Sequence, residues 1–143
     1  MRIAVIGAGG IGAPYGASLA KAGADVTFVA RGAHLTAMRE NGLRIEGDRG
    51  ETHIRAVQAT DDIAGIGAVD VVLCCVKLWD LESVVEQIRA IVGPQTAVIP
   101  LQNGIDAAER MIRILGREPV AWRLSRARSL RRASSGRPEL TSR

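Results

Sequence analysis

The sequence is poor in aromatic residues and in cysteine. Among its 143 residues there are one Phe, one Tyr, two Trp and two Cys. So few aromatic rings provide no platform on which nucleic-acid bases could stack. Cys74 and Cys75 are adjacent in an apolar segment, where a strand would point their side chains to opposite faces. We interpret them as reduced, buried thiols, and we expect no metal site because His34 and His53 fall in unrelated segments.

Long apolar runs are also lacking. No stretch approaches the roughly 20 apolar residues that span a bilayer, and no basic segment precedes an apolar signal region. We therefore expect a cytoplasmic protein without a membrane partner. The formal charge of +4 arises from the C-terminal part, because residues 1–116 carry a net −2 and residues 117–143 a net +6. This distribution gives no reason to expect a nucleic-acid partner.

The most informative segment is an apolar run that leads directly into a glycine cluster at the N-terminus. Ile3 to Ile6 reads as a buried strand. A helical pattern follows the glycines, with Ile11, Leu19 and Ala20 on its apolar side. In this spacing Gly7 permits a tight turn, Gly9 lets the backbone approach a pyrophosphate, and Gly12 lets helix and strand pack closely. A dinucleotide site is predicted, with a purely structural glycine turn as the alternative. The predicted contacts are Gly7, Ala8, Gly9, Gly10, Ile11 and Gly12.

Strand and helix patterns alternate along the rest of the chain. We predict an α/β fold, a doubly wound parallel sheet of the Rossmann type with strand order 3-2-1-4-5. Residues 1–120 would form this domain, and residues 121–143 an irregular basic tail. Asp80 is predicted to cap a helix. The segments are strands at 25–30, 69–76 and 96–101, an edge hairpin at 43–46 and 53–57, and helices that begin after Gly12, near Leu35 and at Gly104. A further helix is predicted from Leu81 to Val92, with a core-facing side at helical spacing that consists of Leu81, Val84, Val85, Ile88 and Ile91.

Three polar residues follow the predicted strands, where such sheets bind ligands. Arg31 suits the 2′-phosphate of NADP, whereas an NAD-specific domain usually has a carboxylate there. Lys77 could hold a substrate carboxylate or a polarised carbonyl, and Asn103 could donate its amide to a ligand. The alternatives are a solvated loop arginine, a surface lysine and an asparagine that only caps a helix.

Five separated segments together resemble the ketopantoate reductases, NADPH-dependent enzymes that reduce 2-dehydropantoate to pantoate. The resemblance covers residues 1 to about 120. It implies that the glycine turn binds the pyrophosphate of NADP and Arg31 its 2′-phosphate. Lys77 and Asn103 would lie beside the nicotinamide and a small 2-keto acid substrate. The matching segments are Gly7–Gly12, Val29–Gly32, Asn41–Ile45, Val76–Lys77 and Leu101–Gly104.

The sequence departs from the family in one respect. Members have a second, helical domain that supplies the general-acid lysine and a substrate-binding carboxylate, and nothing in this chain matches it. We expect NADPH-dependent reduction of a 2-keto acid, impaired in this truncated form. The alternatives are a non-catalytic NADP-binding module or sensor, and a dehydrogenase for another hydroxy acid or amino acid. Loss of that domain would expose an apolar patch around Ile105, Ile112 and Leu115, which a homodimer would cover.

The tail suggests how the second domain was lost. Trp122 has a single codon, TGG. When translation is shifted to start at the last base of this codon, and synonymous codons are chosen for the residues that follow, a different amino-acid sequence results. Residues 122–136 then become a segment that contains Pro-Gly-Val-Ile and resembles the family's continuation. We hypothesise a frameshift near Val120, which the coding DNA would test.

Overall fold

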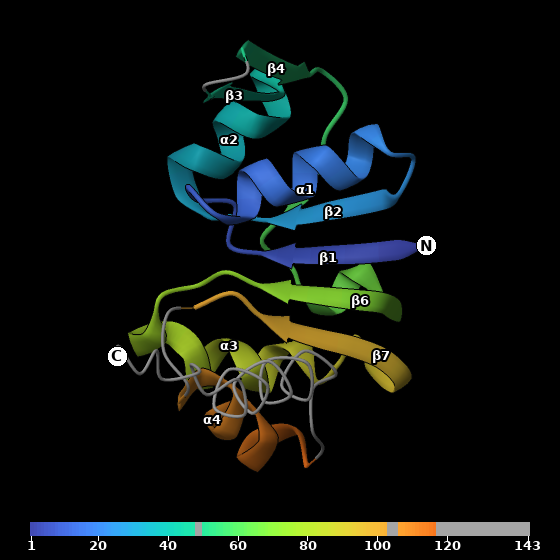
Figure 1. The fold of residues 1–143 in the computed structure, drawn as a ribbon, viewed down its shortest axis with the longest axis vertical. Coiled ribbons are helices and arrows are strands. Elements are labelled where there is room, and N and C mark those ends of the chain that lie inside the picture. Colours follow the sequence, from blue (N-terminus) through green and yellow to red (C-terminus); the bar gives the residue numbers. More distant parts are fainter. Residues whose placement is uncertain (48–49, 103–105, 117–143) are drawn as a thin grey trace, which may run out of the picture.

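The computed structural model describes residues 1–47, 50–102 and 106–116. They form a five-stranded parallel sheet with helices on both faces and a separate two-stranded hairpin (Figure 1). Asn103 and the predicted tail lie outside the described residues. The elements are β1 (Arg2–Ile6), α1 (Gly12–Lys21), β2 (Asp25–Val29), α2 (Gly32–Asn41), β3 (Leu43–Gly47), β4 (Gly50–Ile54), β5 (Gln58–Thr60), η1 (Ala64–Ile66), β6 (Val69–Cys74), η2 (Leu78–Asp80), α3 (Leu81–Ile88), β7 (Val92–Pro100) and α4 (Asp106–Leu115).

The strands of the parallel sheet lie in the order β5-β2-β1-β6-β7. When only these five strands are numbered along the chain, the order reads 3-2-1-4-5, but β5 takes the edge position where the hairpin was expected. From β1 the chain builds outward through β2 and β5, and then crosses to β6 and β7 on the other side. The order therefore reverses between β1 and β6, and ligands of such sheets bind beyond the carboxyl ends of the strands at this point.

The hairpin is not an edge of this sheet, so that part of the prediction was wrong. β3 and β4 form a sheet of their own, with Leu43 opposite Ile54. Figure 1 shows them beyond α2, away from β1 and β2. Ile45 and Ile54 pack against the core on the α1 side of the sheet. The true third strand is β5, which pairs with β2 and has only three residues.

Two cores lie on the two faces of the sheet, because successive side chains of a strand point to opposite sides. Ile3 and Val5 of β1 belong to the core under α1 and α2. Ala4 and Ile6 belong to the core under α3 and α4. Figure 1 shows these two helix pairs on opposite sides of the sheet. This double covering is the predicted winding, and it leaves the carboxyl ends of the strands for a ligand.

The two cysteines lie on opposite faces of the sheet and are both free, as predicted. Cys74 is buried in the core under α3, whereas Cys75 is half-buried and packs on the α1 side. Burial raises the pKa of both thiols, that of Cys75 to about 12. Both thiols are therefore protonated at neutral pH and are poor nucleophiles.

The boundary between α3 and β7 differs from the prediction. The helix ends at Ile88 and the strand begins at Val92, although one helix was expected to run from Leu81 to Val92. Pro94 falls inside the strand, which is possible because β7 is at the edge of the sheet. The positions predicted to face the core are all buried. They are Leu81, Val84, Val85, Ile88 and Ile91.

The expected apolar patch on the last helix is not found among the described residues, and Ile105 lies outside them. Ile112 is half-buried, and Leu115 packs against the core under α3. The helix is held there by Arg110, whose Nε and Nη2 donate to the two carboxylate oxygens of Glu82 at 2.5 and 2.6 Å. The patch was the reason to expect a homodimer, and that reason is removed. The exposed large apolar side chains are Met1, Ile11, Tyr15 and Trp79.

Within the described part of the chain, no helix combines the length and the apolar character that crossing a bilayer demands. The same residues contain no cluster of His, Cys, Asp and Glu side chains that could hold a metal ion.

Candidate functional site

The turn after β1 depends on glycine at its first position. Gly7 has a φ of 96°, in the left-handed region that side chains disfavour. Its N–H donates to the carbonyl of Val29 at 3.1 Å, which joins the turn to the end of β2. A Cβ atom at Gly7 would also lie 3.2 Å from the backbone of Cys75 and Val76. Two constraints inside the protein therefore explain this glycine.

Gly12 is also required by packing. A Cβ atom there would collide with the carbonyl oxygen of Gly7 and would lie 3.1 Å from Cγ1 of Val5. Val5 is fully buried, and Gly7 is held by its hydrogen bond to Val29. Neither neighbour can move aside cheaply, so the close approach of helix and strand predicted for Gly12 is present.

Gly9 and Gly10 have no such explanation within the described chain. A Cβ atom at either position would meet no atom within 4 Å, and neither residue has a positive φ. The backbone here is exposed rather than packed against the protein. The remaining explanation for glycine at these positions is a ligand that approaches the backbone closely, as a pyrophosphate does.

The N-terminus of α1 faces the same side and is suited to an anion. Ile11 is its N-cap residue and provides no side-chain cap, and no acidic residue lies in the first turn. The N–H groups of that turn and the helix dipole therefore favour a negative charge. Ile11 itself is 43% exposed, so its predicted place on the buried side of the helix was wrong. The buried side consists of Gly12, Ala13, Gly16 and Ala17.

Backbone hydrogen bonds fix the strand ends relative to one another. The N–H of Cys75 donates to Ile6 at 2.8 Å, and that of Leu101 donates to Cys74 at 2.9 Å. The N–H of Ala30 donates to Thr60 at 3.1 Å. The segments that follow β1, β2, β6 and β7 are therefore held at one edge of the sheet.

A cavity of about 260 Å³ opens at this edge, between the ends of β1 and β2 and the start of α3. Gly7 and Ala8 of the glycine turn form part of its wall, together with Arg31, which follows β2. The other residues that line the cavity are apolar except for His34 and Asp80. An apolar cavity with a few polar groups suits an organic ligand with one charged end.

Arg31 is exposed at the N-cap position of α2 and forms no ion pair with any described residue. Its guanidinium is therefore available for an anion.

His34 is a wall residue that sequence reasoning missed. Its Nε2 lies 2.8 Å from the carbonyl oxygen of Ala8, and because a carbonyl only accepts, Nε2 carries the proton. The contact ties the first turn of α2 to the glycine turn. Its signal in the sequence was its position one turn of helix beyond Arg31, on the side that faces the glycine turn.

Lys77 lies at the same edge but outside the cavity. It follows β6 after Cys75 and Val76, is exposed, and its carbonyl accepts a backbone hydrogen bond from Asp80 at 3.0 Å. Gln102 donates from Nε2 to the carbonyl of Val76 at 3.0 Å, which ties the segment after β7 to the one that carries Lys77. Asn103, the next predicted site residue, lies outside the described residues. The structure thus brings Arg31 to the glycine turn and places Lys77 further along the edge.

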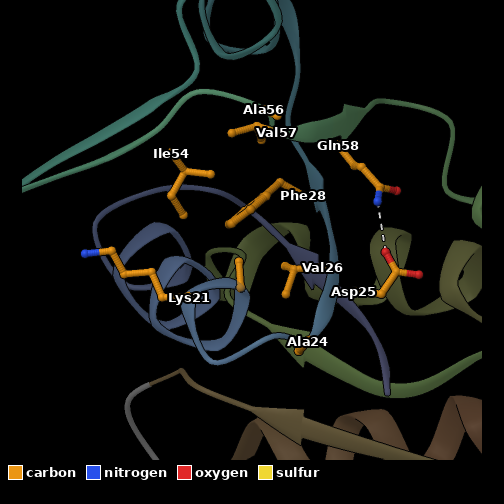
Figure 2. Close-up of a pocket in the computed structure, with 10 residues that line it drawn as sticks. Lys21, Ala24, Asp25, Val26, Phe28, Ile54, Ala56, Val57 and Gln58 are labelled. Atoms are coloured by element: carbon orange, nitrogen blue, oxygen red, sulfur yellow. Dashed lines mark hydrogen bonds between the residues drawn. The ribbon is translucent and has the colours of Figure 1, made fainter.

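A second cavity of about 260 Å³ lies at the other end of β2, against the end of α1 (Figure 2). Phe28 and Ile54 line it, and its polar groups are already used. Gln58 Nε2 donates to Asp25 Oδ1 at 2.9 Å, as Figure 2 shows, and Lys21 Nζ donates to Thr52 at 3.1 Å. Sheets of this type bind ligands at the opposite end, so this cavity is a weaker candidate than the one at Arg31.

Comparison with known proteins agrees with the fold. The family model described as ketopantoate reductase PanE/ApbA matches residues 3–135. The chain is 42% identical over 106 residues to a 2-dehydropantoate 2-reductase of Mesorhizobium japonicum, covering 73% of this chain and 32% of the relative. It is 36% identical over 118 residues to the 2-dehydropantoate 2-reductase of Pyrococcus horikoshii, covering 82% of this chain and 38% of the relative.

A solved structure gives the same result. The PanE/ApbA family ketopantoate reductase of Ralstonia eutropha superposes with a TM-score of 0.77 at 34% identity, covering 83% of this chain and 40% of that chain. This chain thus spans between 32% and 40% of the length of these three relatives. With the glycine turn, the strand order and the matched residues in agreement, the chain belongs to the ketopantoate reductase PanE/ApbA family.

Proposed function

We propose that this chain binds NADP(H) at the edge of the sheet beyond β1 and β2, and that it serves the reduction of a 2-keto acid, 2-dehydropantoate to pantoate. The observation that carries the proposal is the cavity that Arg31 shares with the glycine turn. The two relatives named 2-dehydropantoate 2-reductase support the substrate.

The described residues suit the parts of this cofactor one by one. The exposed backbone at Gly9 and Gly10 and the first turn of α1 would hold the pyrophosphate. Arg31 would hold the 2′-phosphate, since a guanidinium binds phosphate with two hydrogen bonds. The apolar wall of the cavity, including Val76, would cover the adenosine.

The roles proposed for Lys77 and Asn103 concern the substrate. Bound NADPH supplies a hydride to a ketone carbon. Lys77, exposed at the end of β6, would hold the substrate carboxylate or polarise its carbonyl, and Asn103 would orient the same group. Reduction of a ketone also needs a proton donor, which the resemblance to the ketopantoate reductases assigns to a second domain. We therefore propose that the chain on its own binds cofactor but turns over slowly or not at all.

A non-catalytic NADP-binding module or sensor is the second candidate. One observation favours it: Lys77 lies outside the cofactor cavity. It predicts the same binding site but no chemistry with any ketone.

A two-part assay separates these possibilities. Titration of the full 143-residue chain with NADPH and NADH, followed by cofactor fluorescence, should show tighter binding of NADPH. Ketopantoate is then added and the absorbance of NADPH is followed against a blank without protein. We expect a decay close to the blank. A decay well above it would exclude the non-catalytic module, and failure of both dinucleotides to bind would overturn the proposed function.

A further inference from the structure

Two residues of opposite charge line the proposed adenosine cavity from different elements. Arg31 comes from the end of β2, and Asp80 comes from the start of α3. They form no ion pair with each other, and neither forms one with any other described residue. Both side chains are therefore available to a ligand in the same cavity.

Within the described part of the chain, the carboxylate of Asp80 neither caps a helix nor forms an ion pair. The residue occupies the N-cap position of α3, as predicted, but its side chain makes no capping hydrogen bond. Its φ of −94° and ψ of −6° are nearly helical, whereas a capping residue is usually extended. The bond that fixes this residue runs from its backbone N–H to Lys77 at 3.0 Å. Asp80 thus lines the cavity, and its carboxylate has no capping or ion-pair partner among the described residues.

The two side chains favour different cofactors. In dinucleotide-binding domains a carboxylate accepts a hydrogen bond from the ribose 2′-hydroxyl of NAD, whereas an arginine accommodates the 2′-phosphate of NADP. A carboxylate near a phosphate also repels it. From their presence in one cavity we infer that Asp80 is a specificity-determining residue, which lowers the preference for NADP that Arg31 creates and lets the site accept NAD as well.

This inference rests on the proposed function, and Asp80→Asn tests it. The substitution keeps the shape and the hydrogen-bonding oxygen and removes the charge. Titrating the full chain with NADP⁺ and NAD⁺ should show that NADP⁺ binds about three- to tenfold more tightly to the variant, the range for one charge pair near a surface. Affinity for NAD⁺ should stay the same or fall slightly, because an amide oxygen is a weaker acceptor than a carboxylate.

Glu86→Gln is the matched control, because it removes the same charge from an exposed position on the same helix, away from the cavity wall. Its ion pair with Arg89 is on the surface and contributes little. Glu86→Gln should leave the ratio of the two affinities unchanged. If Asp80→Asn also leaves it unchanged while NADP⁺ still binds, the inference about Asp80 is wrong and the proposed function stands. If neither dinucleotide binds the unmodified chain, the proposed function fails instead.

Discussion

A Gly12→Ala variant is expected to lose about 2–3 kcal/mol of unfolding free energy, with a fall in Tm of about 6–10 °C. The added methyl group would collide with the carbonyl oxygen of Gly7, which the hydrogen bond to Val29 holds in place. The protein can relieve the collision only by separating α1 from β1, which displaces the glycine turn. Dinucleotide affinity should then fall on the order of 100-fold, the size of effect that a misplacement of about 1 Å can have.

Gly9→Ala is the control that separates folding from binding. A methyl group at Gly9 meets no protein atom within 4 Å, so the Tm should stay within about 2 °C of the unmodified chain. The methyl group does occupy the space that a pyrophosphate needs, and affinity should fall about 10- to 100-fold through lost hydrogen bonds to phosphate. Thermal unfolding and cofactor titration on both variants measure the two effects. Unchanged affinity in a stable Gly9→Ala variant would contradict a pyrophosphate site at this turn.

The second large effect concerns the choice of cofactor. Arg31→Ala should weaken NADP⁺ binding about 10- to 100-fold, because hydrogen bonds to a charged group contribute about 1.5–3 kcal/mol. NAD⁺ lacks the 2′-phosphate, so its affinity should change less than about threefold. Isothermal titration of both cofactors against both proteins gives the comparison.

Two further variants show whether the effect is specific to Arg31. Arg31→Lys keeps the charge but loses the two-pronged geometry, so it should recover only part of the NADP⁺ affinity. Arg55→Ala removes an equal charge from an exposed position outside the cavity and should change neither affinity. An equal loss of NADP⁺ and NAD⁺ binding in Arg31→Ala would mean that this arginine contacts something common to both cofactors.

The fold was predictable where the sequence has a strong pattern and unpredictable where it has a weak one. The buried run of β1 and the helical spacing of α3 identified these elements. The hairpin residues Ile45 and Ile54 alternate with polar residues as an edge strand does, yet they pack against the α1 side as a separate sheet. β5 has the sequence Gln-Ala-Thr, with no apolar run, so only its pairing with β2 reveals it.

The site residues that form local sequence motifs were predictable. The glycine spacing and Arg31 could be found because their chemistry depends on neighbours along the chain. His34 had only a local signal, its position one helical turn beyond Arg31. Asp80 could not be assigned to the cavity in this way, because it lies at the start of α3, on the other face of the sheet from α2. Asp80 in particular was read as a helix cap, which its sequence position favours and its side chain does not perform.

The most direct test of the account is to locate the binding site of 2′,5′-ADP by amide NMR of the full chain. The central claim predicts that signals from Gly9, Gly10 and Arg31 shift on titration, while those of Ala24 and Gln58 at the other cavity stay in place. Shifts confined to Ala24, Gln58 and their neighbours, with the glycine turn unaffected, would contradict the claim that the carboxyl edge of the sheet binds the cofactor.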